Sequence, residues 1–154
     1  MDKKIQGKKN RQAGARFELK VRTDLESKGW IVDRWSNNVD LEKVKVTANG
    51  IIYNLTSSAV HKLVPAKSNR FGLRNTGFPD FVCFKCRSSG KVWSKIPATY
   101  ELHGVECKSN GYLDQKEKAK CRWYLDKNIF SNILIASKEG KRGKIIYKEF
   151  KWKE

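Results

Sequence analysis

The first clear pattern in the chain is an apolar residue at every fourth position between residues 11 and 28. This spacing places side chains on one face of an α-helix, so it predicts a helix from Arg11 to Lys28 with one buried stripe. Gly29 suits the position just after a helix, where a left-handed backbone is common. Residues 1–10 are basic and lack the pattern, and we expect a flexible N-terminus there. The stripe consists of Ala13, Phe17, Val21 and Leu25.

Strand and helix patterns follow one another in the second half of the chain. Asp114 with Glu117 three residues later forms a capping-box pattern, which predicts a helix from there to about Lys127. We expect its inward face to carry Cys121, Tyr124 and Leu125. The predicted strands are Phe81–Cys86, Tyr100–Lys108, Ile129–Ala136 and Lys144–Phe150. Arg87–Ala98 would form an extended loop or an extra turn, and Lys138–Gly143 a basic turn.

A first strand is predicted within Gly29–Arg34, directly after the first helix, and residues 37–76 form an insertion between it and the later elements. They contain one predicted hairpin, Leu41–Thr47 and Ile51–Leu55, around the turn Ala48–Gly50. At 154 residues, we expect a single α/β domain over residues 1–154. Its core would be a mixed, mostly antiparallel central sheet flanked by a helix on each face.

The charge of the chain indicates its partner. It holds 33 Lys and Arg against 16 Asp and Glu, a formal net charge of +17. Such a surplus favours a polyanion, and nucleic acid is the natural one. No long apolar run or basic amphipathic helix points to a membrane, and no apolar signal region begins the chain, so we expect a cytoplasmic protein. For a viral or phage gene that means the cytoplasm of the host.

The candidate chemistry lies in two short motifs. Asp80 follows a proline turn, and Glu106 and Lys108 stand two apart within an apolar strand. Side chains at i and i+2 of a strand share a face, so the glutamate and the lysine project together, while Val105 and Cys107 point into a core. Two carboxylates and an ammonium group suit phosphodiester hydrolysis assisted by Mg²⁺ or Mn²⁺.

Two alternative interpretations remain open at this point. A chain with 32% charged residues also produces an Asp and an E-x-K by chance, on a solvated strand face. Glu18, beside the apolar stripe of the first helix, either leans towards the site or pairs with Arg22 at i+4.

Four motifs in order carry a family resemblance: Arg16–Glu18, Gly29–Arg34, Pro79–Asp80 and Glu106–Lys108. Together they resemble the PD-(D/E)XK nuclease superfamily. The first two look like archaeal-type Holliday-junction resolvases. The later motifs, with Leu113–Gln115, look like the VRR-Nuc branch, which is common in phage and repair nucleases.

The resemblance implies a restriction-endonuclease-like core and a role for each matching residue. Asp80, Glu106 and the main-chain carbonyl of Cys107 would bind Mg²⁺ or Mn²⁺. Lys108 would orient or activate the attacking water, and the resemblance adds Glu18 and Gln115 to the catalytic set. From the residues themselves, Lys67, Arg70 and Arg74 mark a basic loop that either contacts nucleic acid or is a solvated surface loop. Arg34 and Trp93 are further candidate contacts, with packing as the alternative for the tryptophan.

The implied activity is a metal-dependent DNA endonuclease that cuts branched or structured DNA in recombination or repair. A Holliday-junction resolvase acts as a homodimer, because two symmetric cuts need two sites. Asp80 and Glu106 are farther apart in the sequence than is usual in junction resolvases, which puts the substrate in doubt. The alternatives are a VRR-Nuc-type flap, end or duplex nuclease, and a non-catalytic nucleic-acid-binding module with the same fold.

The four cysteines allow one further alternative. Cys83-x-x-Cys86 has the spacing of half a zinc site, which Cys107, Cys121, His61 and His103 could complete. In a strand, however, Cys83 and Cys86 point to opposite faces. We therefore expect small buried apolar residues rather than zinc ligands.

Overall fold

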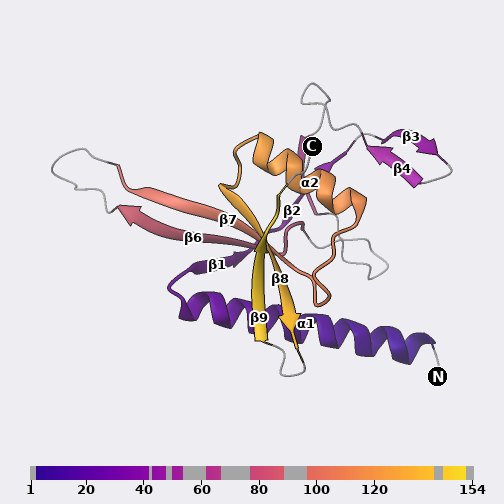
Figure 1. Ribbon diagram of the computed structural model, residues 1–154, viewed down its shortest axis with the longest axis horizontal. Coiled ribbons are helices and arrows are strands. Elements are labelled where there is room, and N and C mark those ends of the chain that lie inside the picture. Colours follow the sequence, from indigo (N-terminus) through magenta and orange to yellow (C-terminus); the bar gives the residue numbers. More distant parts are fainter. Residues whose placement is uncertain are drawn as a thin grey trace.

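The computed structural model describes residues 3–41, 43–47, 50–53, 62–66, 77–88, 97–140 and 144–151. Two helices and nine strands occur in these ranges (Figure 1). In chain order they are α1 (Lys3–Ser27), β1 (Ile31–Arg34), β2 (Asn37–Asp40), β3 (Lys43–Thr47), β4 (Gly50–Tyr53), β5 (Lys62–Pro65), β6 (Phe81–Ser88), β7 (Thr99–Cys107), α2 (Gln115–Asp126), β8 (Asn132–Glu139) and β9 (Lys144–Glu149).

The central sheet has five strands in the order β1-β6-β7-β8-β9. The pairs β1–β6, β6–β7 and β8–β9 are antiparallel, and β7–β8 is parallel. A parallel pair needs a crossover connection, and α2 supplies it between β7 and β8. The predicted mixed, mostly antiparallel sheet is confirmed.

Each face of this sheet is covered by one helix. Val21 of α1 is buried in a cluster with Val105 of β7 and Ala136 of β8. Tyr124 of α2 is buried in another cluster with Ile133 of β8. Because neighbouring residues of a strand point to opposite faces, α1 and α2 lie on opposite sides of the sheet. Neither helix combines the length and the apolar character needed to cross a bilayer.

The first helix is longer than the sequence pattern predicts. It begins at Lys3, so most of the segment expected to be flexible is helical. Lys, Gln and Arg are good helix formers, and no proline interrupts the segment. Figure 1 shows the N-terminal half of α1 projecting past the sheet. Ala13 is consequently exposed, whereas Phe17, at the start of the covered half, is buried.

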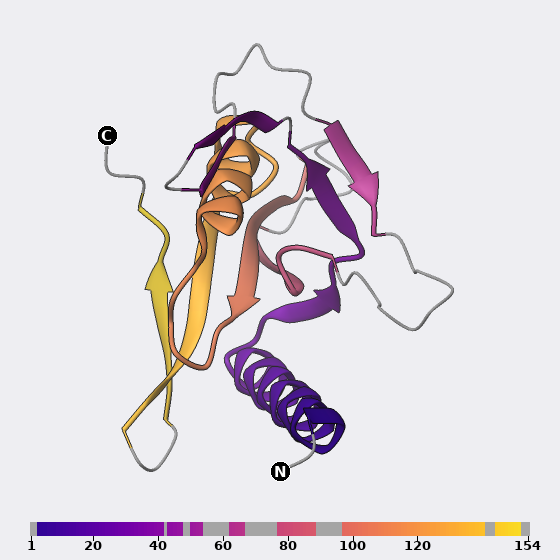
Figure 2. The ribbon, with the colours of Figure 1, turned by 90° about the vertical axis from the view of Figure 1, so that its right-hand side faces the viewer.

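Strands β2 to β5 form two small sheets outside the central sheet. The predicted hairpin is present as the antiparallel pair β3–β4. A second antiparallel pair, β2–β5, was not predicted, and Figure 2 shows these strands side by side. The sequence of β2, Asn37–Asp40, is short and polar and gives little strand signal. Val39 and Leu41 are nevertheless buried in the same cluster as Tyr124, which ties this segment to the core beside α2.

Candidate metal and nucleic-acid site

The turn that carries Asp80 packs closely against the main chain at Trp35. A side chain on Gly77 would overlap the main-chain carbonyl of Trp35, so only glycine fits there. The main-chain N–H of Trp35 in turn donates to the carbonyl of Asp80, at 3.1 Å. Below the turn, a Cβ on Gly104 would come within 2.9 Å of Pro79. These close contacts fix the turn Gly77–Asp80 and hence the position of Asp80 next to the sheet.

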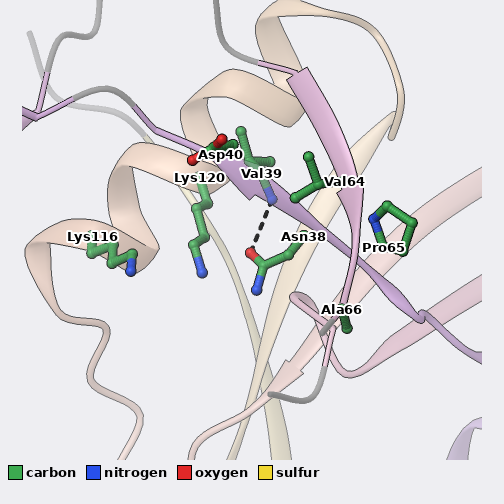
Figure 3. Close-up of a pocket in the computed structure, with 8 residues that line it drawn as sticks. All are labelled: Asn38, Val39, Asp40, Val64, Pro65, Ala66, Lys116 and Lys120. Atoms are coloured by element: carbon green, nitrogen blue, oxygen red, sulfur yellow. Dashed lines mark hydrogen bonds between the residues drawn. The ribbon is translucent and has the colours of Figure 1, made fainter. Parts of the chain in front are cut away.

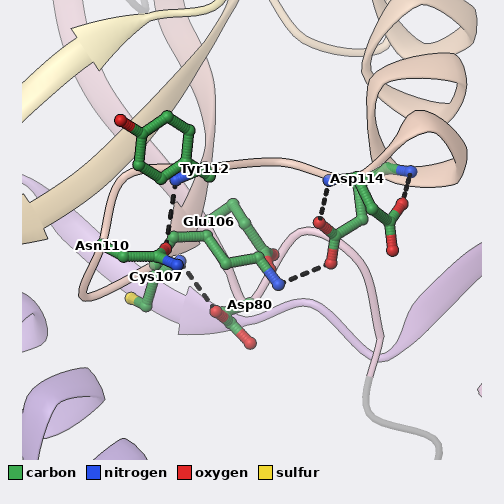
Figure 4. A network of polar contacts seen from close by, with 8 residues as sticks. Asp80, Glu106, Cys107, Asn110, Tyr112 and Asp114 are labelled. Atoms are coloured by element: carbon green, nitrogen blue, oxygen red, sulfur yellow. Dashed lines mark hydrogen bonds and ion pairs between the residues drawn. The ribbon is translucent and has the colours of Figure 1, made fainter.

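The carboxylate of Asp80 lies at the end of β7. Its Oδ2 accepts a hydrogen bond from the main-chain N–H of Cys107, at 2.9 Å (Figure 4). Because the bond goes to the residue after Glu106, the two acidic residues are neighbours in space although 26 positions separate them in the chain. The structure therefore brings the two predicted metal-binding carboxylates together.

Glu106 and Lys108 share one side of β7, as the i, i+2 spacing predicted. The Nζ of Lys108 is 3.1 Å from Oε1 of Glu106. Glu106 is buried, with 5% of its surface exposed, and Val105 on the opposite face is fully buried. A buried carboxylate is costly unless its charge is compensated, so this position is specialised rather than part of a solvated strand face.

Glu117 is the residue that the sequence interpretation missed. The predicted capping box at the start of α2 is present, with Oε2 of Glu117 accepting from the main-chain N–H of Asp114 at 2.9 Å. The other oxygen, Oε1, lies 2.5 Å from Nζ of Lys108. Glu117 therefore joins the helix cap to the candidate catalytic lysine. Its capping role was visible in the sequence, but its second contact depends on the turn after β7.

The electrostatics of the site follow from burial and from two adjacent acids. Burial raises the pKa of Glu106 to about 8, and the charge of Asp80 adds to the rise. Burial likewise raises the pKa of Asp80 to about 6, against the opposing hydrogen bond from Cys107. For Lys108, burial lowers the pKa, but the bonds and charges of Glu117 and Glu106 outweigh it and raise the pKa overall. The lysine is therefore a permanent cation at neutral pH.

Glu18 and Arg34 form an ion pair beside this cluster. Their side chains meet at 2.8 Å, joining α1 to the end of β1. The charge of Glu18 raises the pKa of Asp80 and that of Arg34 lowers it, so both act on the site electrostatically. The alternative partner of Glu18 is not used, because Arg22 pairs with Glu26.

The structure does not place the remaining predicted residues in the site. Gln115 is exposed at the first position of α2, and the site contact from this helix comes from Glu117 instead. Lys67, Arg70, Arg74 and Trp93 lie outside the described residues.

The free oxygens of the two carboxylates fit a divalent cation. Oδ2 of Asp80 and Oε1 of Glu106 are engaged by protein groups. Oε2 of Glu106 is buried and has no hydrogen-bond partner, a costly arrangement that a cation would relieve. Among the described residues, no group of three or more His, Cys, Asp or Glu side chains could hold a metal. Two carboxylates with the carbonyl of Cys107 suit Mg²⁺, which keeps several of its waters.

The cysteines occupy the positions expected of strand and core residues. Cys83 is buried and Cys86 is exposed, consistent with opposite faces of β6. Burial raises the pKa of the Cys83 thiol to about 12, and Cys121 is buried in the core with a raised pKa too. Thiols held in the neutral form are poor nucleophiles.

Comparisons of the chain with models of known families, with curated proteins and with solved structures return no match. The site is therefore interpreted from its own geometry and from the resemblance of its motifs.

Proposed function

We propose that the protein is a metal-dependent endonuclease that hydrolyses phosphodiester bonds in branched or structured DNA, with a four-way junction as the first candidate substrate. One observation carries the proposal: the buried pair Asp80 and Glu106 has an unsatisfied oxygen beside a cationic lysine. Burial raises the pKa of both acids and the charge of Asp80 raises that of Glu106 further, so a bound cation would stabilise their ionised forms. A divalent cation is the ligand that fits oxygen donors of this kind.

Each residue of the cluster has a distinct task in this proposal. Asp80, Glu106 and the carbonyl of Cys107 hold the cation. When bound, Mg²⁺ or Mn²⁺ supplies positive charge that stabilises the transition state at phosphorus and makes water more acidic. Lys108 remains protonated, so it orients the water and stabilises negative charge on the phosphate rather than acting as a base. Glu117 fixes the position of the lysine ammonium, and Glu18 influences Asp80 through its charge.

The net charge and the projecting helix support a nucleic-acid substrate. From residue 4 to residue 16, α1 carries basic residues and no acidic one. This half of the helix lies outside the sheet (Figure 1). A row of cations on the helix that also carries Glu18 favours binding of a phosphate backbone through counterion release. The basic residues are Lys4, Lys8, Lys9, Arg11 and Arg16.

The test is cleavage of labelled four-way junction, flap, fork, single-stranded and plain duplex DNA, each with Mg²⁺, Mn²⁺ or EDTA. Asp80→Asn and Glu106→Gln should each lower the cleavage rate by more than about 100-fold while DNA binding is retained. Glu139→Gln, an exposed acid at the end of β8, serves as the matched control and should cut like the wild type.

The preferred substrate decides between the versions of the proposal. Preference for the junction supports a resolvase-like enzyme, and then a homodimer is expected by light scattering, because paired cuts need two sites. Preference for flaps or ends supports a VRR-Nuc-type activity. Tight metal-independent binding with no cutting of any substrate would replace the nuclease with a non-catalytic binding module.

A further inference from the structure

A pocket of about 220 Å³ lies between α2 and the β2–β5 pair (Figure 3). This volume far exceeds the ~15 Å³ that a single water requires. Its apolar side is formed by Val39 and by the end of β5, Val64–Ala66. Its polar side chains are Asn38, Asp40, Lys116 and Lys120. Two lysines one helical turn apart thus face a cavity built by a segment inserted between the first strand and the rest of the fold.

Lys120 is the unusual member of this set. Only 8% of its surface is exposed, and its Nζ lies 5.0 Å from the centre of the Phe78 ring. Within the described part of the chain, no carboxylate is within ion-pair distance of it. Burial and the charge of Lys116 lower the pKa of Lys120, and the charges of Glu117, Glu106 and Asp114 do not offset the two. Buried cations are normally paired, so an anion in the pocket would complete the surroundings of Lys120.

The remaining polar groups of the pocket are arranged to suit an anion. The amide oxygen of Asn38 accepts from the main-chain N–H of Val39 at 2.9 Å, which leaves the amide nitrogen as a donor. Figure 3 shows the Asn38 amide between the strands and the ammonium group of Lys120. The carboxylate of Asp40 lies at the far end of the Lys120 side chain, away from the ammonium. The donors of the pocket, Asn38 and the two lysines, thus lie on its polar side.

We propose that this pocket binds a backbone phosphate of the nucleic-acid strand that lies next to the scissile bond. The inference rests on the proposed function. Its position supports it, because Lys120 follows Glu117 on α2 by one turn. Glu106 and Glu117 also act on Lys120 through their charges, so the pocket is within electrostatic reach of the candidate metal site. A nucleic-acid strand held both in the pocket and at the candidate metal site would have its scissile phosphate fixed next to Asp80 and Glu106.

The first measurement is DNA binding in EDTA, where no cutting occurs, as a function of salt concentration. Lys120→Met should weaken binding about 10-fold, because a charge-assisted bond to phosphate is lost. The slope of log K against log salt should fall by about 0.7–0.9. Lys116→Met should act in the same direction. Lys118→Met removes an exposed charge from the same helix outside the pocket, and should change affinity less than about 2-fold.

A second readout separates a phosphate contact from a structural role of the lysine. Lys120→Met removes a buried unpaired charge but keeps the aliphatic stem, so its melting temperature should equal or exceed that of the wild type. Loss of binding without loss of stability supports the pocket. Lys116 is exposed on α2, so Lys116→Met should fold even if Lys120→Met does not. Unchanged DNA binding by a folded Lys116→Met would then contradict the proposal.

A scan with single neutral methylphosphonate linkages identifies the source of the phosphate. One position in the strand should weaken binding to the wild type but not to Lys120→Met. Binding of inorganic phosphate in the pocket without any such position would show a free-phosphate site and overturn the proposal. Equal behaviour of the Lys120 and Lys118 variants would overturn it too. A positive scan from a protein that never cuts DNA would refute the nuclease while supporting the pocket.

Discussion

Replacement of Glu106 by glutamine tests the electrostatics of the carboxylate pair with almost no change of shape. In the metal-free protein the pKa of Glu106 is about 8, against 4.5 for an ordinary glutamate. The folded state therefore holds a proton that the unfolded state releases above pH 4.5. Stability is fully present below the unfolded pKa and is lost as pH rises towards 8. Glutamine mimics the protonated acid and does not titrate.

The expected effect is large and depends on pH. Each pKa unit corresponds to about 1.4 kcal/mol, so at pH 7 Glu106→Gln should raise the free energy of unfolding by on the order of 3 kcal/mol. For a chain of this size that is a rise of roughly 10 °C in melting temperature. At pH 5 the two proteins should differ by less than about 1 kcal/mol, because most of the titration lies above that pH.

The assay is urea unfolding followed by tryptophan fluorescence at pH 5, 6, 7 and 8 in EDTA. Glu139→Gln, an exposed acid, should stay within about 0.5 kcal/mol of the wild type throughout. Addition of Mg²⁺ or Mn²⁺ should stabilise the wild type far more than Glu106→Gln, by about 2.7 kcal/mol at 100 times the dissociation constant. A stability difference that is constant from pH 5 to pH 8, or a destabilised glutamine variant, would refute the reasoning.

Three further predictions follow from single contacts. Lys108→Met should lower cleavage at least about 100-fold yet keep metal-induced stabilisation, and equal loss of both would show that the lysine supports the metal ligands instead. Tyr112→Ala removes a side chain that is 78% exposed beside the site (Figure 4), and should cost about 1–3 kcal/mol in binding of DNA with unpaired bases but nothing on plain duplex. Gly77→Ala should destabilise the fold by about 2 kcal/mol or more in thermal unfolding, whereas Gly14→Ala, where an added Cβ meets nothing within 4 Å, should be neutral or stabilising.

The parts of the site that lie close together in the sequence were predictable. Because Glu106 and Lys108 are two residues apart on a strand, their spacing predicted that they share one side. The three-residue spacing of Asp114 and Glu117 predicted the capping box of α2. The approach of Asp80 to β7 was implied only by the resemblance, because no local pattern relates residues so far apart. The contact of Glu117 with Lys108 was missed because the capping role of Glu117 already explained a glutamate at that position.

The features that depend on packing between distant segments of the chain were not predictable. Lysine on a helix is normally taken as a solvent-facing residue, whereas Lys120 is buried where α2 faces the β2–β5 pair. That pairing joins Asn37 to Pro65 across a long stretch of chain with weak strand propensity. The early start of α1 was missed because the helix projects past the sheet and leaves no apolar stripe to detect.

The anchoring of Asp80 to Trp35 has a consequence for how the chain folds. Glu106, Lys108 and Glu117 belong to one strand–turn–helix unit, whose contacts are local and close early. Asp80 reaches them through the β6–β7 pairing, but its turn is held at Trp35, a distant part of the chain whose docking carries the cost of closing a long loop. Tight ion binding would therefore report that the Trp35 segment has docked, because a chain without that contact has the lysine and the acids but no fixed position for Asp80.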